Sequence, residues 1–259
     1  MLYICNMNKK ISEVTLGKHD IFLMNNVSKS TYSQLANQLN SSVKIVQKRL
    51  SLIGYNKRCL PNTTLKLLKD VKNNNRNYIM GLLSTDGLIV YNTKRSDYRI
   101  SITSKDEEQV QNVKKFFQKG SIYKFKKYFI YTTGERILIE YLISIGITPN
   151  KSKTINYLNK ITWDYVRGVI DGDGYVCTLG KRKYVTIYTI SNIFKDQLIT
   201  FFRNKNMTPT VQTIIKENRQ PLYRINIFKK RDFLKLREKI YSNYQTKLFL
   251  TRKKLKFYA

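Results

Sequence analysis

Every second residue is apolar in several stretches after residue 76, which is the pattern of strands with one buried face. YRISITS (residues 98–104) and LYRINIF (222–228) show it clearly. Side chains two positions apart share a face of a strand, so Arg99 and Arg224 lie on the face opposite the isoleucines. The pattern predicts antiparallel sheets that bury one face under helices and leave a polar, partly basic face open.

Segments with helical spacing interrupt these strands, and the same order of elements occurs twice. The first copy is expected to contain a helix at 77–86, strands at 88–94 and 98–104, a helix at 106–119, strands at 121–127 and 128–133, and a helix at 134–146. The second is expected to contain a helix at 163–173, strands at 175–181 and 183–191, a helix at 193–206, strands at 208–216 and 222–228, and a helix at 230–241. The predicted fold class is α+β, with pseudo-symmetric αββαββα halves at 77–159 and 160–259, the second ending in a basic tail.

Residues 1–76 are predicted to form a separate helical domain that ends in the stretch KNNNRN, taken as a linker. Residues 30–55 predict two short helices joined at Asn40, because asparagine tolerates a left-handed turn and Ser41 or Ser42 can cap the second helix. This arrangement resembles helix-turn-helix DNA-binding domains. The residues that would face a major groove are Ser42, Lys44, Gln47 and Lys48. The alternative is an ordinary helical hairpin whose basic face is only solvated.

The net charge narrows the class of partner. The chain has 48 Lys+Arg against 17 Asp+Glu, a formal net charge of +31. The surplus is +10 in residues 1–76, +6 in 77–159 and +15 in 160–259, so it is not confined to one tail. Such a charge repels itself unless a polyanion neutralises it. A nucleic-acid partner is therefore favoured over a merely basic soluble protein.

The remaining composition excludes several other classes. No apolar stretch approaches the roughly 18 residues of a membrane-spanning helix, and the start MLYICNMNKK does not predict secretion. The 3 cysteines are isolated, which argues against disulfides and predicts an intracellular, reducing compartment such as the cytoplasm, the nucleoid or an organelle matrix. With one histidine, His19, zinc and histidine-based hydrolases are excluded.

Two similar stretches open the two halves, and they carry the candidate chemistry. NYIMGLLSTDG (77–87) and WDYVRGVIDGDG (163–174) place Gly81 against Gly168, and Asp86 against Asp173, 87 residues apart. A glycine inside a helix costs about 1 kcal/mol relative to alanine. That cost is justified if the two helices pack backbone to backbone, and such packing brings the terminal aspartates together.

Two carboxylates at helix C-termini repel each other and the helix dipoles. A hard divalent cation with oxygen ligands, Mg²⁺ above all, would relieve the repulsion and could support phosphodiester hydrolysis. DGDG is more often a turn, and it is similar to a calcium loop, but Tyr175 and Arg182 stand where that loop needs acidic residues. Asp171 corresponds to Ser84 rather than to an acid, so it is expected to be structural.

IMGLLSTDG (79–87) and VRGVIDGDG (166–174) resemble two copies of the LAGLIDADG motif. The chain is thus similar to a single-chain, two-motif LAGLIDADG homing endonuclease with an added helix-turn-helix-like domain. The resemblance implies a saddle of two sheets and Mg²⁺-dependent cleavage of a long, asymmetric double-stranded DNA site by a monomer, with Mn²⁺ or Ca²⁺ as other possible occupants. It also implies metal ligation by Asp86, Asp173 and the backbone carbonyls of Thr85 and Gly172, and a role in the spread of an intron or free-standing mobile gene.

Further residues enter on the same basis. Family members often place a lysine near the metals, and the candidates are Lys151 or Lys153 after the first copy and Lys247 after the second. Ser104 and Ser191 end equivalent strands and are candidates for orienting water. The expected DNA-contacting residues are Lys44, Gln47, Lys48, Lys94, Arg95, Arg99, Lys181, Arg182, Lys183, Arg224 and Asn226.

Two departures and two rival functions stay open at this point. Met80 and Arg167 stand where the motif has a small residue, so either the helix contact is looser or Arg167 points outward. The first rival is an RNA maturase or a transcription regulator on the same fold, without cleavage. The second is a nucleic-acid-packaging protein, which would need the charge but not the paired motifs.

Overall fold

The computed structural model describes residues 18–26, 30–52, 63–180, 182–242 and 247–259. They belong to two compact units, residues 1–63 and 64–259, which are treated separately. Among the described residues, no helix has both the length and the apolar character that crossing a membrane requires.

The described residues of the first unit form the helices α1 (Lys18–Asn26), α2 (Tyr32–Gln38) and α3 (Val43–Leu52). Thr31 and Gln34 form a capping box at α2, and Asn40 takes the predicted left-handed conformation with φ 46°. The small core consists of Leu23, Leu35, Ala36, Val46 and Leu50. Helix α1 was not predicted. It joins α3 through a two-bond ion pair between Asp20 and Arg49, with distances of 2.5 and 2.6 Å.

The boundary between the units lies after Thr63, so the predicted boundary after residue 76 is wrong. Helix α4 (Thr63–Lys69) packs on the second unit: Leu68 is buried in its core and the Thr64 hydroxyl donates to the Phe117 carbonyl. The stretch KNNNRN is not a linker, because Asn73 caps the following helix by accepting the Arg76 N–H. Asparagine favours both caps and linkers, so composition alone did not distinguish them.

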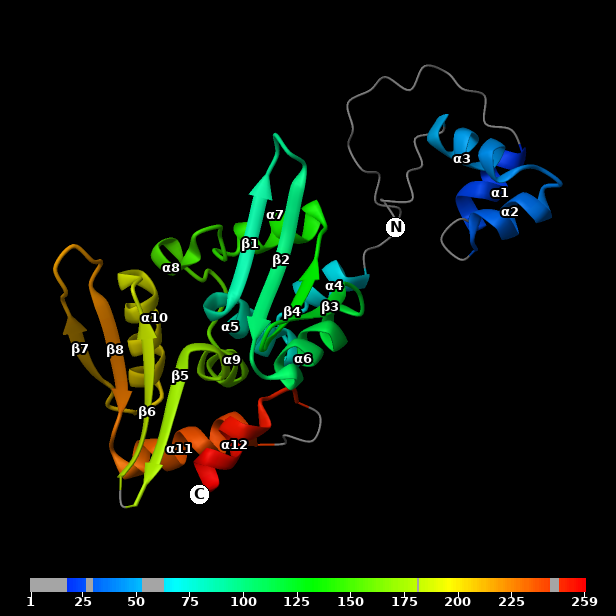
Figure 1. Cartoon of the computed structure of the whole chain (residues 1–259). Coiled ribbons are helices and arrows are strands. Elements are labelled where there is room, and N and C mark those ends of the chain that lie inside the picture. Colours follow the sequence, from blue (N-terminus) through cyan, green and yellow to red (C-terminus); the bar gives the residue numbers. More distant parts are fainter. Residues whose placement is uncertain (1–17, 27–29, 53–62, 181, 243–246) are drawn as a thin grey trace. The chain divides into compact units, whose positions relative to one another are not determined.

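Apart from α4 and the turn that follows it, the second unit consists of the two predicted halves (Figure 1). The first half comprises α5 (Asn74–Thr85), β1 (Gly87–Asn92), β2 (Asp97–Ser104), α6 (Glu107–Phe117), β3 (Ser121–Phe125), β4 (Tyr128–Thr133), α7 (Arg136–Ser144) and α8 (Lys151–Thr154). The second comprises α9 (Trp163–Asp173), β5 (Gly174–Leu179), β6 (Arg182–Thr189), α10 (Asn192–Asn204), β7 (Thr210–Ile214), β8 (Leu222–Ile227), α11 (Lys230–Tyr241) and α12 (Thr251–Tyr258). The α+β prediction is confirmed.

Each half contains one four-stranded antiparallel sheet, in the orders β1-β2-β4-β3 and β5-β6-β8-β7. In the first sheet, Ile102 and its partner Tyr131 are buried on the face covered by α6 and α7. In the second, Ile187 and its partner Ile225 are buried on the face covered by α10 and α11. The faces that carry Arg99 and Arg224 are the open ones, as the alternation predicts.

Helices α5 and α9 pack side by side between the two sheets, and one hydrophobic core continues through both halves (Figure 1). The basic tail is a structured element: α12 buries Phe257 and Lys253, and Leu248 and Leu250 ahead of it are also buried. The apolar residues at 248, 250 and 257 therefore anchor the end of the chain, although lysines surround them.

Candidate active site

Helices α5 and α9 touch through their backbones at two glycines. A Cβ atom added to Gly81 would lie 2.0 Å from the Tyr165 carbonyl oxygen, and one added to Gly168 would lie 2.0 Å from that of Tyr78. Both distances are far below van der Waals contact, so a larger residue at either position would push the helices apart. The contact is reciprocal, as expected for two copies related by a pseudo-twofold axis.

A tyrosine from each helix reaches across to the other. The Tyr78 hydroxyl of α5 donates to Asp171 Oδ2 at 3.0 Å, and the Tyr165 hydroxyl of α9 donates to Ser84 Oγ at 2.8 Å. Asp171 and Ser84 occupy equivalent positions of the paired motifs, and both accept a hydrogen bond from a buried tyrosine. Asp171 Oδ2 also accepts the Leu250 N–H at 2.7 Å. Asp171 thus contacts buried scaffold groups.

The ends of the two helices come together at the terminal aspartates. Asp86 caps α5 and Asp173 is the last residue of α9. A Cβ atom on Gly172 would lie 1.9 Å from Thr85 Oγ1 and 3.4 Å from the Asp86 carboxyl carbon, so the helix ends are in contact. Surrounding atoms raise the pKa of both carboxyl groups by desolvation, and the like charge of Asp86 raises that of Asp173 further. Both effects disfavour two bare carboxylates and favour a bound cation.

Gln109 of α6 orients Asp86, and the sequence analysis missed it. Its Nε2 donates to Asp86 Oδ2 at 2.9 Å, and its Oε1 accepts from Ser104 Oγ at 2.5 Å. Ser104 therefore acts on the site through Gln109. Ser191 has no similar role, because it caps α10 and donates to the Ile155 carbonyl.

Two lysines lie at the C-terminal ends of the motif helices. Lys151 donates to the Thr85 carbonyl. Lys253 of α12 donates to the carbonyls of Ile170, Asp171, Gly172 and Gly174 at 2.6 to 2.9 Å. Thr85 and Gly172 occupy equivalent positions in the two motifs. Each half therefore has one lysine whose ammonium group donates to the carbonyl at that position. Burial lowers the pKa of both lysines, that of Lys253 to about 8.

The two other lysine candidates do not lie at the helix ends. Lys247 Nζ lies 3.2 Å from Asp164 in the first turn of α9, about 14 Å along the helix axis from Asp173. The prediction for Lys247 is therefore wrong. Lys153 is exposed on α8. Lys247 is the first lysine after the second copy, whereas Lys253 lies farther along the chain, and only the fold of α12 returns Lys253 to the helix end.

Arg167 points inward, so of the two alternatives for this motif position the outward side chain is wrong. It is 1% exposed and donates to the Leu248 and Ile240 carbonyls at 2.8 Å and to Asp164 at 2.6 Å. Its guanidinium also lies 5.3 Å from the centroid of the Tyr78 ring. An arginine is accommodated at this motif position because it holds the C-terminal segment.

The predicted DNA-contacting residues differ in how exposed their side chains are. Those on exposed surface are Lys44, Gln47 and Lys48 on α3, Lys94 and Arg95 in the turn after β1, Arg99 on β2 and Arg182 on β6. Arg224 is half-buried on the open face, and Lys183 donates to the Ala259 carbonyl at 2.6 Å. Asn226 is 3% exposed and accepts the Thr186 hydroxyl at 2.8 Å, so its selection was wrong. Lys181 lies outside the described residues.

The donor set at the helix ends fits a hard cation. The part of the chain that the structure describes has no group of three or more His, Cys, Asp and Glu side chains suited to a metal. The available protein donors are the carboxylates of Asp86 and Asp173 and the neighbouring carbonyls, all oxygen atoms. Mg²⁺ and Ca²⁺ prefer oxygen, and Mg²⁺ retains waters when protein ligands are few.

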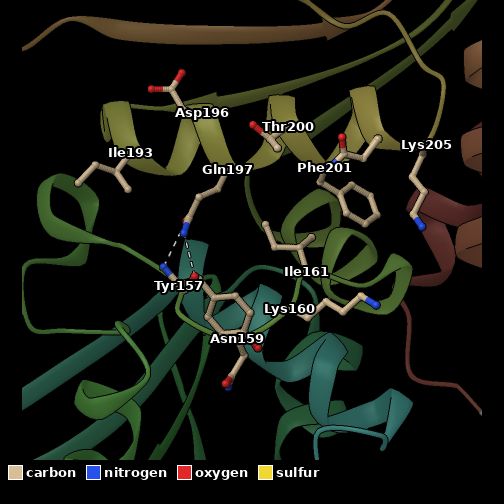
Figure 2. Close-up of a pocket in the computed structure, with 11 residues that line it drawn as sticks. Tyr157, Asn159, Lys160, Ile161, Ile193, Asp196, Gln197, Thr200, Phe201 and Lys205 are labelled. Atoms are coloured by element: carbon tan, nitrogen blue, oxygen red, sulfur yellow. Dashed lines mark hydrogen bonds between the residues drawn. The ribbon is translucent and has the colours of Figure 1, made fainter.

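A pocket of about 560 Å³ lies elsewhere, between α10 and the segment at residues 157–161. Gln197 of α10 reaches across it to the backbone of Tyr157 (Figure 2). Its lining residues include neither Asp86 nor Asp173. The paired carboxylates therefore form a site of their own.

Comparison with known proteins supports the fold. The sequence profile of the LAGLIDADG-like domain matches residues 163–241. The homing endonuclease I-WcaI bound to its DNA recognition sequence matches with a TM-score of 0.53 and 15% identity, over 80% of this chain and 96% of that one. I-DmoI in complex with DNA and Mn matches with a TM-score of 0.48 and 19% identity, over 65% and 97%. No curated protein matches the chain.

The resemblance inferred from the paired motifs is thus confirmed: residues 163–241 are similar to the LAGLIDADG-like domain, and the fold is that of a homing endonuclease. The first motif, at residues 79–87, lies outside the matched segment. Its equivalence to the second is carried by the reciprocal glycine contact and the paired helix ends.

Proposed function

We propose that this chain, which carries a LAGLIDADG-like domain, is a site-specific endonuclease that cleaves double-stranded DNA with a divalent metal at Asp86 and Asp173. One observation carries the proposal. Two helices in backbone contact bring two carboxylates together between two sheets whose polar faces are open. A scaffold protein has no need of two repelling acids at touching helix ends, whereas a phosphodiesterase has.

In the proposed mechanism, Asp86, Asp173 and the carbonyls of Thr85 and Gly172 would hold the metal. Bound there, Mg²⁺ would supply positive charge to the phosphate and the leaving oxygen. Gln109 fixes the Asp86 carboxylate through its 2.9 Å hydrogen bond. For each strand cleaved, a water oxygen bonds to phosphorus, one ester P–O bond breaks, and the leaving oxygen takes up a proton.

The lysines would stabilise the charge that develops in this step. Lys151 and Lys253 place ammonium groups at equivalent helix ends, beside the two carboxylates. Electrostatic stabilisation of developing charge is often the largest single contribution to catalysis. Lys253 thereby replaces Lys247 as the candidate from the second half, and Lys151 is retained.

The partner is proposed to be a long, non-palindromic duplex bound by a monomer. One chain supplies two unlike halves, so each strand of an asymmetric site would meet its own set of side chains. The net charge of +31 suits this partner, since phosphate contacts dominate DNA affinity. Helix α3, with Lys44, Gln47 and Lys48 exposed, would add a further groove contact.

Cleavage of DNA that spans the gene's own insertion locus tests the proposal. We expect double-strand cutting with Mg²⁺ and none with EDTA. Asp86→Asn and Asp173→Asn should each lower the cleavage rate by more than about 100-fold, the scale of losing one electrostatic catalytic group. Both variants should still bind the duplex, which gel-shift titration checks.

The matched control is Asp196→Asn on α10, the helix that covers the second sheet on the side away from its open face; the exposed Asp196 carboxylate forms an ion pair with Lys195. This substitution should change cleavage little. Binding without cutting by the unsubstituted protein, unaffected by Asp173→Asn, would overturn the nuclease proposal and favour a maturase or a transcription regulator. Association with any duplex regardless of sequence would favour a packaging role.

A further inference from the structure

The two sheets carry different side chains on the open faces of β3 and β4 and of the equivalent strands β7 and β8. Figure 1 shows where these strands lie. Both strand pairs follow the same register, so their cross-strand pairs can be compared. The pairs on the open face are Ser121–Thr132, Tyr123–Ile130 and Phe125–Tyr128 in the first sheet, and Thr210–Asn226, Gln212–Arg224 and Ile214–Leu222 in the second.

The middle pair is where the halves diverge. The first pairs are polar in both sheets and the third are apolar in both. Tyr123–Ile130 presents a ring and an aliphatic chain where Gln212–Arg224 presents an amide and a guanidinium. The Tyr123 side chain is exposed, with 51% of its surface accessible, so its ring is available to a partner.

Phe125 follows Tyr123 on the same face of β3, and two lysines lie beyond it. Phe125 on the same strand is 58% exposed. Lys126 and Lys127 lie at the tip of the hairpin, 5.6 Å from the Phe125 ring and 5.8 Å from the Tyr128 ring. A partner that meets this surface must therefore combine an apolar contact with negative charge within a few ångströms.

The major groove of DNA has that combination. The 5-methyl group of thymine is its apolar feature, and phosphates line both sides. Amide and guanidinium groups instead hydrogen-bond to adenine and guanine edges. A protein partner would also have to be acidic to match the lysines, and it would leave the equivalent polar pair unexplained.

We propose that Tyr123 and its cross-strand neighbour Ile130 make the first half recognise thymine methyl groups. Gln212 and Arg224 make the second half recognise base edges by hydrogen bonds. This rests on the proposed function, because it assumes that the open faces meet DNA. It assigns different specificity determinants to the two halves of one binding site.

The test begins with selection of preferred duplexes from a randomised library in EDTA, at one fixed salt concentration. The unsubstituted chain, Tyr123→Ala and Gln212→Ala are selected in parallel. We expect each variant to relax base preference in a different half of the site. The half relaxed by Tyr123→Ala should contain thymine at the relaxed positions.

Uracil, which lacks the methyl group, is then substituted for thymine in one half at a time. In the half assigned to Tyr123, each contacted methyl group removed should weaken binding about fourfold, the equivalent of burying one methyl-sized group. In the other half, uracil should have little effect. Tyr123→Phe keeps the ring and should keep the uracil effect, whereas Tyr123→Ala should bind thymine and uracil duplexes equally.

Two failures can be told apart. If the unsubstituted chain selects no duplex at all, the proposed function fails and this inference with it. If it selects and cleaves a site but the half relaxed by Tyr123→Ala is insensitive to uracil, the methyl-reading inference alone is overturned. Loss of the uracil effect in Tyr123→Phe would likewise overturn it, by making the hydroxyl the recognition group.

Discussion

Helices α5 and α9 occupy equivalent positions, yet only some of their contacts are repeated. The glycine contact is the same in both directions, with an added Cβ 2.0 Å from the opposing carbonyl in each case. The cross-helix tyrosines are also repeated, but their acceptors are Asp171 in one half and Ser84 in the other. Backbone contact tolerates one residue type, whereas any oxygen in the right place satisfies a hydroxyl donor.

Lys151 and Lys253 likewise lie at equivalent helix ends but come from different parts of the two halves. Lys151 lies on α8 of the first half, whereas Lys253 lies on α12, in the C-terminal segment of the second half. That segment also binds the first half: the Thr251 N–H donates to Glu108 and Arg252 forms an ion pair with Asp106. Lys253 therefore reaches its helix end from a segment that also contacts the first half.

The largest expected effect is a loss of stability when the glycine contact shared by the two halves is disturbed. Gly81→Ala and Gly168→Ala should each destabilise the fold by about 3 kcal/mol or more, because the new methyl group meets a backbone carbonyl that cannot move aside. Urea denaturation followed by circular dichroism measures this. Gly180→Asn is the control: Gly180 has φ 56°, which asparagine tolerates, and nothing lies within 4 Å of an added Cβ. Similar stability of the control and the Gly168 variant would contradict the close packing.

The second prediction separates the two tyrosine acceptors. Asp171→Ala should cost about 2–4 kcal/mol, because it leaves both the Tyr78 hydroxyl and the Leu250 N–H unsatisfied. Ser84→Ala should cost about 1–2 kcal/mol, because it leaves one hydroxyl. Double-mutant cycles with Tyr78→Phe and Tyr165→Phe isolate each pair. Equal losses of stability in Asp171→Ala and Ser84→Ala would show that Asp171 contributes no more than a tyrosine acceptor, as Ser84 does.

The third prediction separates the lysines. Lys253→Met should lower stability by about 1.5–3 kcal/mol, because the ammonium group serves several buried carbonyls. Lys151→Met, which removes one such bond, should lower it less. Both should slow cleavage. Thermal unfolding measures the loss of stability, and single-turnover rates measure the loss of cleavage. A greater loss of stability in Lys151→Met than in Lys253→Met would contradict the prediction.

The smallest effect is a pH dependence that differs between the halves. Burial alone would raise the pKa of Asp232 on α11, but hydrogen bonds from the Thr208 N–H and hydroxyl lower it overall. The hydrogen bond from Arg136 lowers the pKa of Glu140 on α7, but that side chain is 42% exposed and solvent screens the pair. A lowered pKa stabilises the fold above the unfolded pKa, near 4, and the contribution disappears as the pH falls through the folded value.

Asp232→Asn should therefore be less stable than the unsubstituted chain at pH 7, by roughly 1 kcal/mol. The difference should fade below about pH 4. Glu140→Gln should show a smaller difference with the same sign. Denaturation curves at several pH values check both, and a difference for Asp232→Asn that persists at low pH would contradict the titration.

Much of the framework could be predicted from local pattern. The helices at 163–173 and 230–241 have the expected bounds, and the alternation around Ile100 and Ile225 placed the correct faces toward the core. The pairing of Asp86 with Asp173 followed from the repeat. The errors at residue 76 and at Asn226 have a common cause: a polar residue that caps a helix or bonds to a neighbour has the same local sequence as one that is solvated.

The sequence by itself determined the duplicated αββαββα plan and the two helix-terminal aspartates, because helical and strand spacing and the glycine positions are local properties. The tertiary structure decided which other residues reach those aspartates. Gln109 and Lys253 are joined to the ends of the motif helices by contacts that span 23 to 83 residues, and the inward Arg167 of α9 donates to the Leu248 carbonyl, 81 residues away. Local periodicity does not specify contacts between residues so far apart, because they arise only when α6 and α12 pack beside α5 and α9.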